Sequence, residues 1–275
     1  MSTDTRPTPT PDNPMGELPF GYTQLGPIDE MICDEGCGEV YYQRGYITPD
    51  RMAVIERTPC RCMMEKYNRQ KTEWDISETR TRQANLTYNA ERYFGGYDLL
   101  MDKAYDRMTF DNYKPINHSQ QDALKRLQGF TPGQDNICLY GAAGRGKTHL
   151  AMSVARIAKG QGNVVLAIKA IDMLTRLKRT YDRKDDEAEI EIMRLLKDVD
   201  LLVIDDIGTE HTTEWVRSKF YEVIEYRHRR KSTVLTTNLT GAEMKAKEGS
   251  ALVSRIMSAE ICLEIEGNDH RMRRD

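Results

Sequence analysis

Short apolar runs alternate with amphipathic segments along the second half of the chain. The runs are ICLY (137–140), VVLAI (164–168), LLVIDD (201–206), STVLTTN (232–238) and ICLEI (261–265). Between them, residues 148–160, 170–197 and 213–231 carry apolar positions at helical spacing. Buried strands that alternate with amphipathic helices are typical of a parallel sheet. We therefore predict an α/β domain over residues 113–275.

The first 112 residues show no such alternation. Residues 1–27 hold six of the ten prolines and predict a flexible tail. Residues 28–83 form a separate small module with four cysteines, followed by a polar, charged stretch, MMEKYNRQKTEWDISETRTRQ, that predicts a helix. Residues 84–112 are expected to be a linker.

Composition narrows the class of protein. The net charge of the 275 residues is −3, so a contact with nucleic acid requires a local basic patch. No apolar run approaches the roughly 20 residues that a membrane span needs, and the N-terminus lacks a secretory pattern. We expect a cytoplasmic protein without a membrane partner. Six cysteines in a reducing compartment favour metal ligands or core thiols over disulfides.

The segment GAAGRGKT (141–148) fits the P-loop pattern G-x-x-x-x-G-K-[ST]. It follows a predicted strand and begins a predicted helix, which is where backbone N–H groups and the helix dipole bind phosphates. Lys147 is expected to reach the β and γ phosphates of ATP, and the Thr148 hydroxyl to ligate Mg²⁺. The predicted nucleotide contacts come from Gly141, Ala142, Ala143, Gly144, Arg145, Gly146, Lys147, Thr148 and His149.

Two later strands end in polar residues that complete such a site. Asp205 and Asp206 follow the apolar run LLVI, at the edge where open α/β sheets bind ligands. Asp205 is the expected Mg²⁺ partner, and Asp206 is placed to orient or deprotonate water. Asn238 ends the next strand and is expected near the γ-phosphate. The alternatives are a solvated acidic pair and a helix-capping asparagine.

These motifs, in this order, resemble the AAA+ ATPases of the DnaC/DnaI/IstB type. The resemblance runs from TFDNY (109–113) through the P-loop, LLVIDDIGTE, STVLTTNL and LVSRIM to GNDHR (267–271). It implies an AAA+ sheet with a central P-loop strand, ATP hydrolysis and a sensor role for Asn238. It further implies an arginine finger at Arg255, a second sensor at Arg271, and Phe110 and Tyr113 near the base. The alternative for Arg255 is a surface arginine.

Two features depart from the larger AAA+ proteins. Asp206 stands where many of them carry glutamate, so its carboxylate reaches less far. Ten residues follow Ile265, too few for their helical lid. We therefore expect nucleotide closure to depend on a neighbouring subunit in an ATP-dependent homo-oligomer.

The cysteines of the first module are spaced as CDEGC (33–37) and CRC (60–62). Four thiolates complete the tetrahedral coordination of Zn²⁺. A module this small needs a bound metal or a similar cross-link to stabilise its fold. We predict Zn²⁺ at Cys33, Cys37, Cys60 and Cys62, with free cysteines as the alternative. Cys138 and Cys262 lie in predicted strands and are expected to be core thiols. The layout resembles DnaI-like loaders, in which such a module docks on the replicative helicase.

A basic cluster, TRLKRTYDRK (175–184), follows the second predicted strand. On a helix, Arg176, Arg179 and Arg183 share one face. With an aromatic side chain, such a stripe suits single-stranded DNA. The alternative is charge pairing with the acidic segment DDEAEIE (185–191). The candidate DNA-binding residues are Arg176, Lys178, Arg179, Tyr181 and Arg183.

These observations predict an ATP-dependent loader that places a hexameric DnaB-type replicative helicase on single-stranded DNA. Two alternatives stay open. The first is an IstB-like ATPase that delivers a transposase to target DNA. The second is a nucleotide-gated adaptor of helicase or DNA with little turnover.

Overall fold

The computed structural model describes residues 15–33, 37–133, 135–183, 186–208, 213–248 and 250–269. They form two compact units, residues 1–80 and 81–275. The division lies close to the boundary predicted at residue 83. Arg271, the candidate second sensor, lies outside the described residues.

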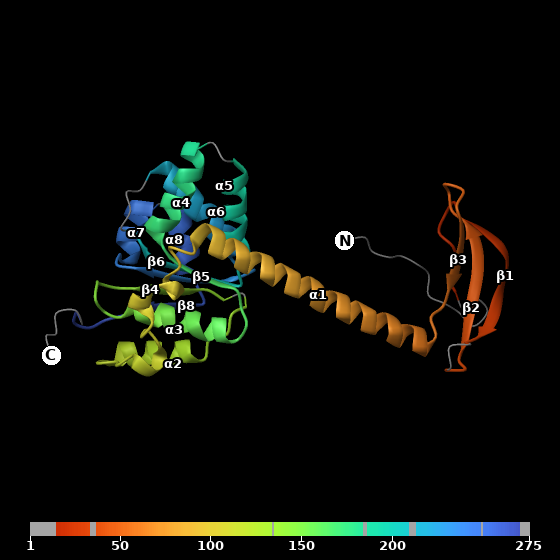
Figure 1. The fold of residues 1–275 in the computed structure, drawn as a ribbon, viewed down its shortest axis with the longest axis horizontal. Coiled ribbons are helices and arrows are strands. Elements are labelled where there is room, and N and C mark those ends of the chain that lie inside the picture. Colours follow the sequence, from red (N-terminus) through yellow and green to blue (C-terminus); the bar gives the residue numbers. More distant parts are fainter. Residues whose placement is uncertain are drawn as a thin grey trace. The chain divides into compact units, whose positions relative to one another are not determined.

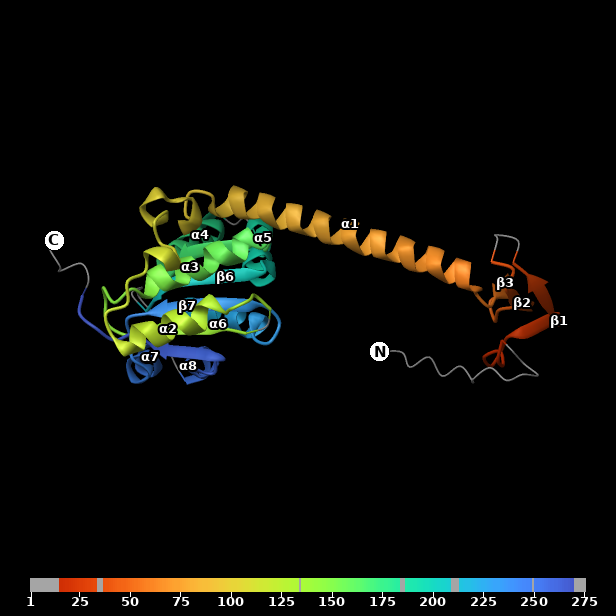
Figure 2. The ribbon, with the colours of Figure 1, turned by 90° about the horizontal axis from the view of Figure 1, so that it is seen from below.

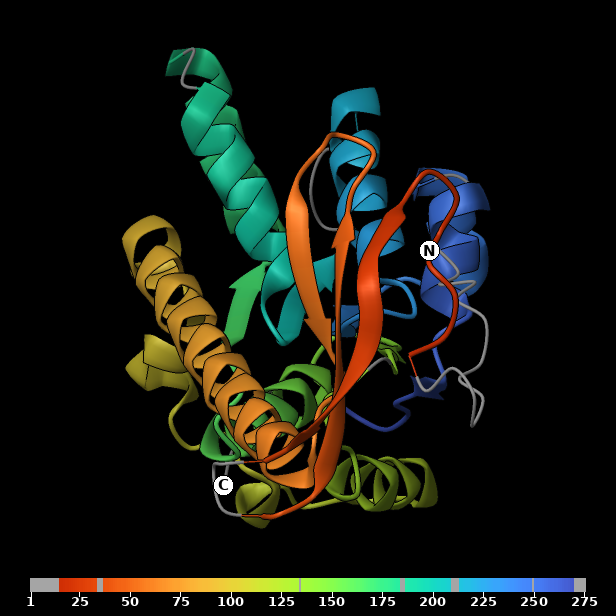
Figure 3. The ribbon, with the colours of Figure 1, turned by 90° about the vertical axis from the view of Figure 1, so that its right-hand side faces the viewer.

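The first unit contains a three-stranded antiparallel sheet (Figure 3) of β1 (Thr23–Ile32), β2 (Val40–Ile47) and β3 (Ala53–Arg57). The buried guanidinium of Arg44 bonds Glu56 Oε2 at 2.7 Å and the carbonyl of Gly16. The Tyr22 and Tyr46 rings lie 5.6 Å apart. Residues 16–27 therefore contribute to this sheet, although their prolines predict a tail.

The predicted charged helix is confirmed as part of α1 (Arg61–Phe94). Polar residues cover nearly all sides of α1, and only Leu86 and Phe94 are buried. A helix that is polar all round has no core-facing stripe over most of its length. Both buried residues belong to the core of the second unit.

The second unit is built on a five-stranded parallel sheet with the order β5-β6-β7-β4-β8. All five predicted strands are confirmed. The P-loop strand β4 lies between β7 and β8, so it is interior, while β7 occupies the middle. The strands are β4 (Ile137–Tyr140), β5 (Val165–Lys169), β6 (Leu201–Ile207), β7 (Ser232–Thr237) and β8 (Ile261–Glu264).

Helices cover both faces of this sheet (Figure 1), with α2 and α3 on one side and α4 to α8 on the other. The helices α7 and α8 lie side by side in both views (Figures 1 and 2). Among the described residues, every helix is too short or too polar to cross a bilayer. Their bounds are α2 (His118–Gln128), α3 (Lys147–Gly160), α4 (Ala170–Arg183), α5 (Asp186–Asp198), α6 (Glu214–Arg227), α7 (Gly241–Glu248) and α8 (Ser250–Met257).

Strand alternation divides the core into two layers. On β5, Leu166 and Ile168 pack in the cluster that contains α4 to α8. Val165 and Ala167 point the other way and pack with α2 and α3. Strands buried on both faces read as continuous apolar runs, which is why the sequence pattern located them.

Residues 84–112 differ from the linker that the sequence predicts. Leu99, Leu100 and Phe110 are buried in the layer of α2 and α3. Leu99 and Leu100 lie on the single-turn helix η1 (Leu99–Met101) and Phe110 on η3 (Phe110–Asn112), with η2 (Lys103–Tyr105) between them. Each of these helices is only three residues long, which is too short for a helical period to show in the sequence.

Candidate functional site

The P-loop joins β4 to α3, and its glycines are required by its geometry. Gly146 caps α3 with a left-handed φ of 91°, and a Cβ there would lie 2.8 Å from Tyr113 Cε2. Gly141 has a φ of 128°, and a Cβ there would lie 2.7 Å from the Ile265 carbonyl oxygen. Side chains at either position would strain the backbone and clash. The loop is thus held in shape by the pre-P-loop segment and by the residue after β8.

Lys147 ties the loop to the neighbouring strand. Its Nζ donates to the carbonyl oxygens of Gly141 (2.6 Å) and Ala142 (2.8 Å) and to Asn238 Oδ1 (2.8 Å). The side chain is buried. The ammonium group therefore lies where the loop and the end of β7 meet, as a phosphate-binding lysine must.

The two aspartates occupy different positions. Asp205 is buried, and its Oδ1 accepts from the hydroxyls of Thr148 (2.8 Å) and Thr236 (2.6 Å). A carboxylate and a hydroxyl at this spacing are the hard oxygen ligands that Mg²⁺ prefers. The donor set therefore fits the ion, with Thr148 and Asp205 as the residues that would hold it.

Asp206 interrupts the regular alternation of side-chain directions along β6. Its φ is 63°, and the pairing of β6 with β7 shifts between Ile204 and Ile207. Its amide donates to Thr236 Oγ1 at 2.8 Å, and its Oδ1 accepts from Asn238 Nδ2 at 2.6 Å. The left-handed backbone, which aspartate tolerates, brings both carboxylates to one cavity.

These residues line a cavity of about 670 Å³. Tyr113 and the P-loop from Ala143 to His149 contribute to the lining, together with Asp205, Asp206 and Asn238. Gly141 and Ala142 face Lys147 through their carbonyls. Phe110 is buried in the core instead, because the single turn of η3 carries it inward. The lining residues that sequence reasoning missed are Ala104, Tyr105, Met108, Asn112, Lys114, Lys169 and Thr236.

The wall before the P-loop is held by aromatic and histidine contacts. The Tyr113 and His149 rings meet edge to face at 5.2 Å, and His149 Nε2 lies 2.8 Å from the Thr109 carbonyl oxygen. Burial raises the pKa of Tyr113 to about 12, so its hydroxyl stays a neutral donor. The hydroxyl is buried and has no hydrogen-bond partner among the residues that the structure describes. A bound nucleotide is a candidate acceptor for it.

Arg255 does not line this cavity. It lies on α8, where its Nη2 donates to Glu225 Oε1 of α6 at 3.2 Å. The side chain is 39% exposed. An exposed arginine away from its own cavity is compatible with a role at the nucleotide of a neighbouring subunit, which remains a prediction.

The basic stripe is only partly available to a ligand. The Arg176 guanidinium lies 5.7 Å from the centre of the Tyr97 ring, and Arg179 Nη1 donates to the Tyr97 hydroxyl at 3.1 Å. Lys178 and Arg179 are exposed, whereas Arg176 is half-buried. Tyr181 and Arg183 belong to α4, but their side chains lie outside the described residues.

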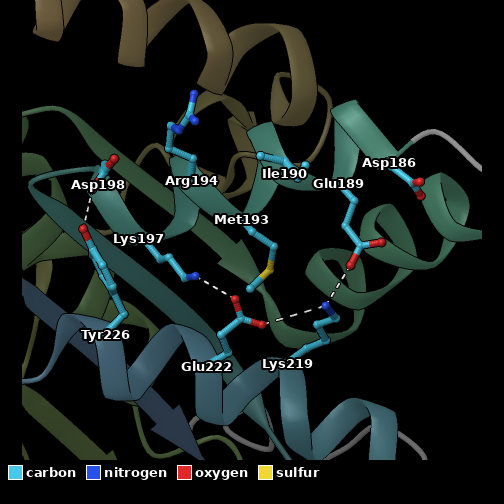
Figure 4. Close-up of a pocket in the computed structure, with 10 residues that line it drawn as sticks. All are labelled: Asp186, Glu189, Ile190, Met193, Arg194, Lys197, Asp198, Lys219, Glu222 and Tyr226. Carbon is cyan, nitrogen blue, oxygen red and sulfur yellow. Dashed lines mark hydrogen bonds and ion pairs between the residues drawn. The ribbon is translucent and has the colours of Figure 1, made fainter.

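The acidic residues that follow the stripe form ion pairs with basic side chains outside it. Glu189 Oε1 accepts from Lys219 at 2.7 Å, and Glu191 accepts from Arg194 at 2.8 Å. A groove of about 600 Å³ between α5 and α6 (Figure 4) contains this Glu189–Lys219 pair and the Lys197–Glu222 pair at 2.6 Å. These ion pairs bridge two helices. We therefore assign the groove to α5–α6 packing rather than to a ligand.

The four cysteines of the first unit meet in one cluster. Their Sγ atoms lie within 4.8 Å of one another, and three of the separations are 3.1, 3.3 and 3.4 Å. A tetrahedral Zn²⁺ with Zn–S bonds near 2.3 Å needs separations of roughly 3.8 Å. Small outward shifts would admit the ion. None of the four forms a disulfide, so Cys33, Cys37, Cys60 and Cys62 fit a metal site.

The core thiols are also placed as expected. Cys138 of β4 and Cys262 of β8 are register partners inside the sheet. Cys138 is completely buried, and Cys262 packs against the same core.

The sheet order, the P-loop after β4 and the acidic pair on β6 define a P-loop nucleotide-binding protein of the AAA+ class. The model of the IstB-like ATP binding protein family matches residues 82–275, and the chain belongs to that family. The match begins after the cysteine module, which therefore lies outside the shared part.

Two relatives are named for different roles. A replicative helicase loader DnaC of Buchnera aphidicola subsp. Acyrthosiphon pisum (strain APS) is 27% identical over 173 residues, covering 61% of this chain and 70% of the loader. The putative ATP-binding protein of insertion sequence IS232 from Bacillus thuringiensis subsp. berliner is 29% identical over 176 residues, covering 62% and 69%. A crystal structure of the DnaC helicase loader superposes with a TM-score of 0.54 at 28% identity, over 60% of this chain and 100% of that one.

Proposed function

We propose that this protein hydrolyses ATP and uses the nucleotide cycle to load a replicative helicase onto single-stranded DNA. The observation that carries the proposal is the chain of contacts from Lys147 through Asn238 to Asp206, with Thr148 and Asp205 beside it. It joins the phosphate-binding lysine to a carboxylate that can act on water. An inert nucleotide-binding fold would not need these contacts.

Each residue has a distinct task in the proposed reaction. Lys147 and the P-loop amides bind the phosphates, and Thr148 and Asp205 hold Mg²⁺, which neutralises phosphate charge. Asp206 accepts a proton from the attacking water or orients it, and the Asn238 amide fixes Asp206 relative to Lys147. Arg255 is proposed to reach the γ-phosphate of a neighbouring subunit in an ATP-dependent oligomer, where its planar guanidinium would bind developing charge.

The cysteine cluster supports the choice of a helicase as the partner. The cysteine module lies outside the ATPase part that the family shares, and with Zn²⁺ bound it would give the protein a second binding surface. We propose that this module docks on the hexameric helicase. The α4 stripe is proposed to contact single-stranded DNA, chiefly through Lys178, Arg179 and Arg183.

Helicase loading can be tested in a reconstituted reaction. A replicative helicase from the same organism is mixed with circular single-stranded DNA, which it cannot thread unaided, and helicase bound to the circle is counted. The proposal expects loading that requires this protein and ATP. Absence of loading, with ATP turnover intact, would remove the loader function while retaining the ATPase.

The insertion-sequence relative favours a second function. An ATPase that delivers a transposase to target DNA would use the same nucleotide site. It would bind double-stranded DNA and a transposase, without the helicase. Negligible turnover in the presence of DNA and helicase would favour a nucleotide-gated adaptor instead, consistent with aspartate rather than glutamate at position 206.

A further inference from the structure

Two lysines besides Lys147 line the nucleotide cavity and have no role in the reaction described above, the exposed Lys114 and the half-buried Lys169. Lys169 is the last residue of β5, at the carboxyl edge of the sheet. It lines the cavity together with Lys147 and Asp205, and it is half-buried. A half-buried ammonium group in an anion-binding cavity is a candidate ligand contact.

The sheet register places Lys169 beside the proposed magnesium ligand. Its Cα pairs with that of Asp205 on the adjacent parallel strand. Val165 and Ala167 face the layer of α3, and Lys169, two residues further, shares their face. Leu201 and Val203 face the same layer, so Asp205 also points there, where Thr148 meets it. Lys169 at the end of β5 and Lys147 at the start of α3 therefore line the same cavity as Asp205.

Tyr105 lines the same cavity as Lys169. The neighbouring Tyr105 side chain is the largest cause of a raised pKa of Lys169, with Asp172 and Asp205 adding to the effect. Lys169 is therefore charged at neutral pH. Tyr105 is itself fixed, because Arg156 Nη2 donates to its carbonyl oxygen at 2.8 Å.

We propose that Lys169 is a second phosphate-binding lysine that contacts the terminal phosphate and so distinguishes ATP from ADP. The inference rests on ATP binding in the proposed function. The triphosphate must share the cavity with two carboxylates, Asp205 and Asp206. A cation beside Asp205 reduces the repulsion between these carboxylates and the terminal phosphate. ADP lacks that phosphate, so the cation should favour ATP.

The test measures ATP and ADP affinity by competition with a fluorescent nucleotide, in saturating Mg²⁺ and again in EDTA. Lys169→Met should weaken ATP binding about tenfold or more, and ADP binding threefold or less. Lys169→Arg should recover part of the loss, and Tyr105→Phe should show a smaller loss of the same kind. The control is Lys159→Met, which removes the same charge from an exposed position on α3 outside the cavity.

Three results would overturn the inference. Equal losses for ATP and ADP would make Lys169 a structural residue. No loss would remove it from the site. A loss of ATP affinity in Mg²⁺ but not in EDTA would mean that Lys169 acts through Asp205 and the ion rather than on phosphate. Failure of the unmodified protein to bind ATP would instead refute the proposed function.

Discussion

Lys147 Nζ and Asn238 Oδ1 lie 2.8 Å apart, although 91 positions separate them in the chain. The other end of the same amide donates to Asp206 at 2.6 Å. One side chain thus sets the position of both the phosphate-binding cation and the carboxylate proposed to act on water. The coupling arises because β7 pairs with both β4 and β6.

Replacing Asn238 should separate nucleotide binding from turnover. Asn238→Ala removes the link to Asp206, so we expect ATP turnover to fall roughly 100-fold. ATP affinity should change only a few-fold, because Lys147 keeps its contacts with Gly141 and Ala142. Steady-state ATPase and nucleotide-binding assays measure the two effects.

A matched control for this variant is Asn163→Ala, since Asn163 bonds the Ala158 carbonyl oxygen at the far end of α3. It should leave both quantities unchanged. If Asn238→Ala kept normal turnover, Asn238 would be only a capping residue.

Arg255→Ala should bind ATP normally and lose turnover at least tenfold. Mixing it with a Lys147→Ala protein should restore part of the activity, because each partner supplies the group that the other lacks. Glu225→Gln breaks the same ion pair but keeps the guanidinium, and exposed pairs contribute little to stability, so it should remain active. No recovery on mixing would argue against a role in trans.

The cysteine cluster should bind one zinc ion per chain. Cys60→Ser should lose the ion, whereas Cys262→Ser should retain it, because Cys262 belongs to the sheet of the second unit. Elemental analysis of the purified proteins measures this directly. Native protein that is free of metal, with all four thiols titratable, would identify them as unligated cysteines.

The exposed part of the α4 stripe should contribute to binding of single-stranded DNA. Changing Lys178 and Arg179 to alanine should weaken binding and reduce the salt slope by about 1.4, at roughly 0.7 per phosphate contact. Lys125→Ala on α2 is the control for loss of surface charge. An unchanged slope would assign Arg179 to its contact with Tyr97 alone.

The sequence predicted the parts of the fold that repeat with a clear period. The five apolar runs correspond to the five strands of the sheet. The P-loop and Asp205 lie at the carboxyl ends of their strands, as the apolar runs predicted. Of the cavity wall formed by residues 104–114 the sequence predicted only Tyr113, through the family resemblance, since single helical turns have no period. Lys169 was missed because a lysine after an apolar run resembles an ordinary strand end. Only the register with Asp205 reveals its position.

The contact between Arg176 and Tyr97 could likewise not be predicted from the sequence. Spacing on α4 places the arginines on one face, but it does not show what that face meets. The ring that meets it comes from the segment after α1, some eighty residues earlier in sequence.

The central claim is tested most directly by weighing the assembly in a native mass measurement. The protein is mixed with ATP, Mg²⁺ and the replicative helicase of the same organism. We expect a complex of defined stoichiometry between the hexameric helicase and this protein. Intact, folded protein that forms no complex with the helicase would contradict the loader account and favour the transposition function.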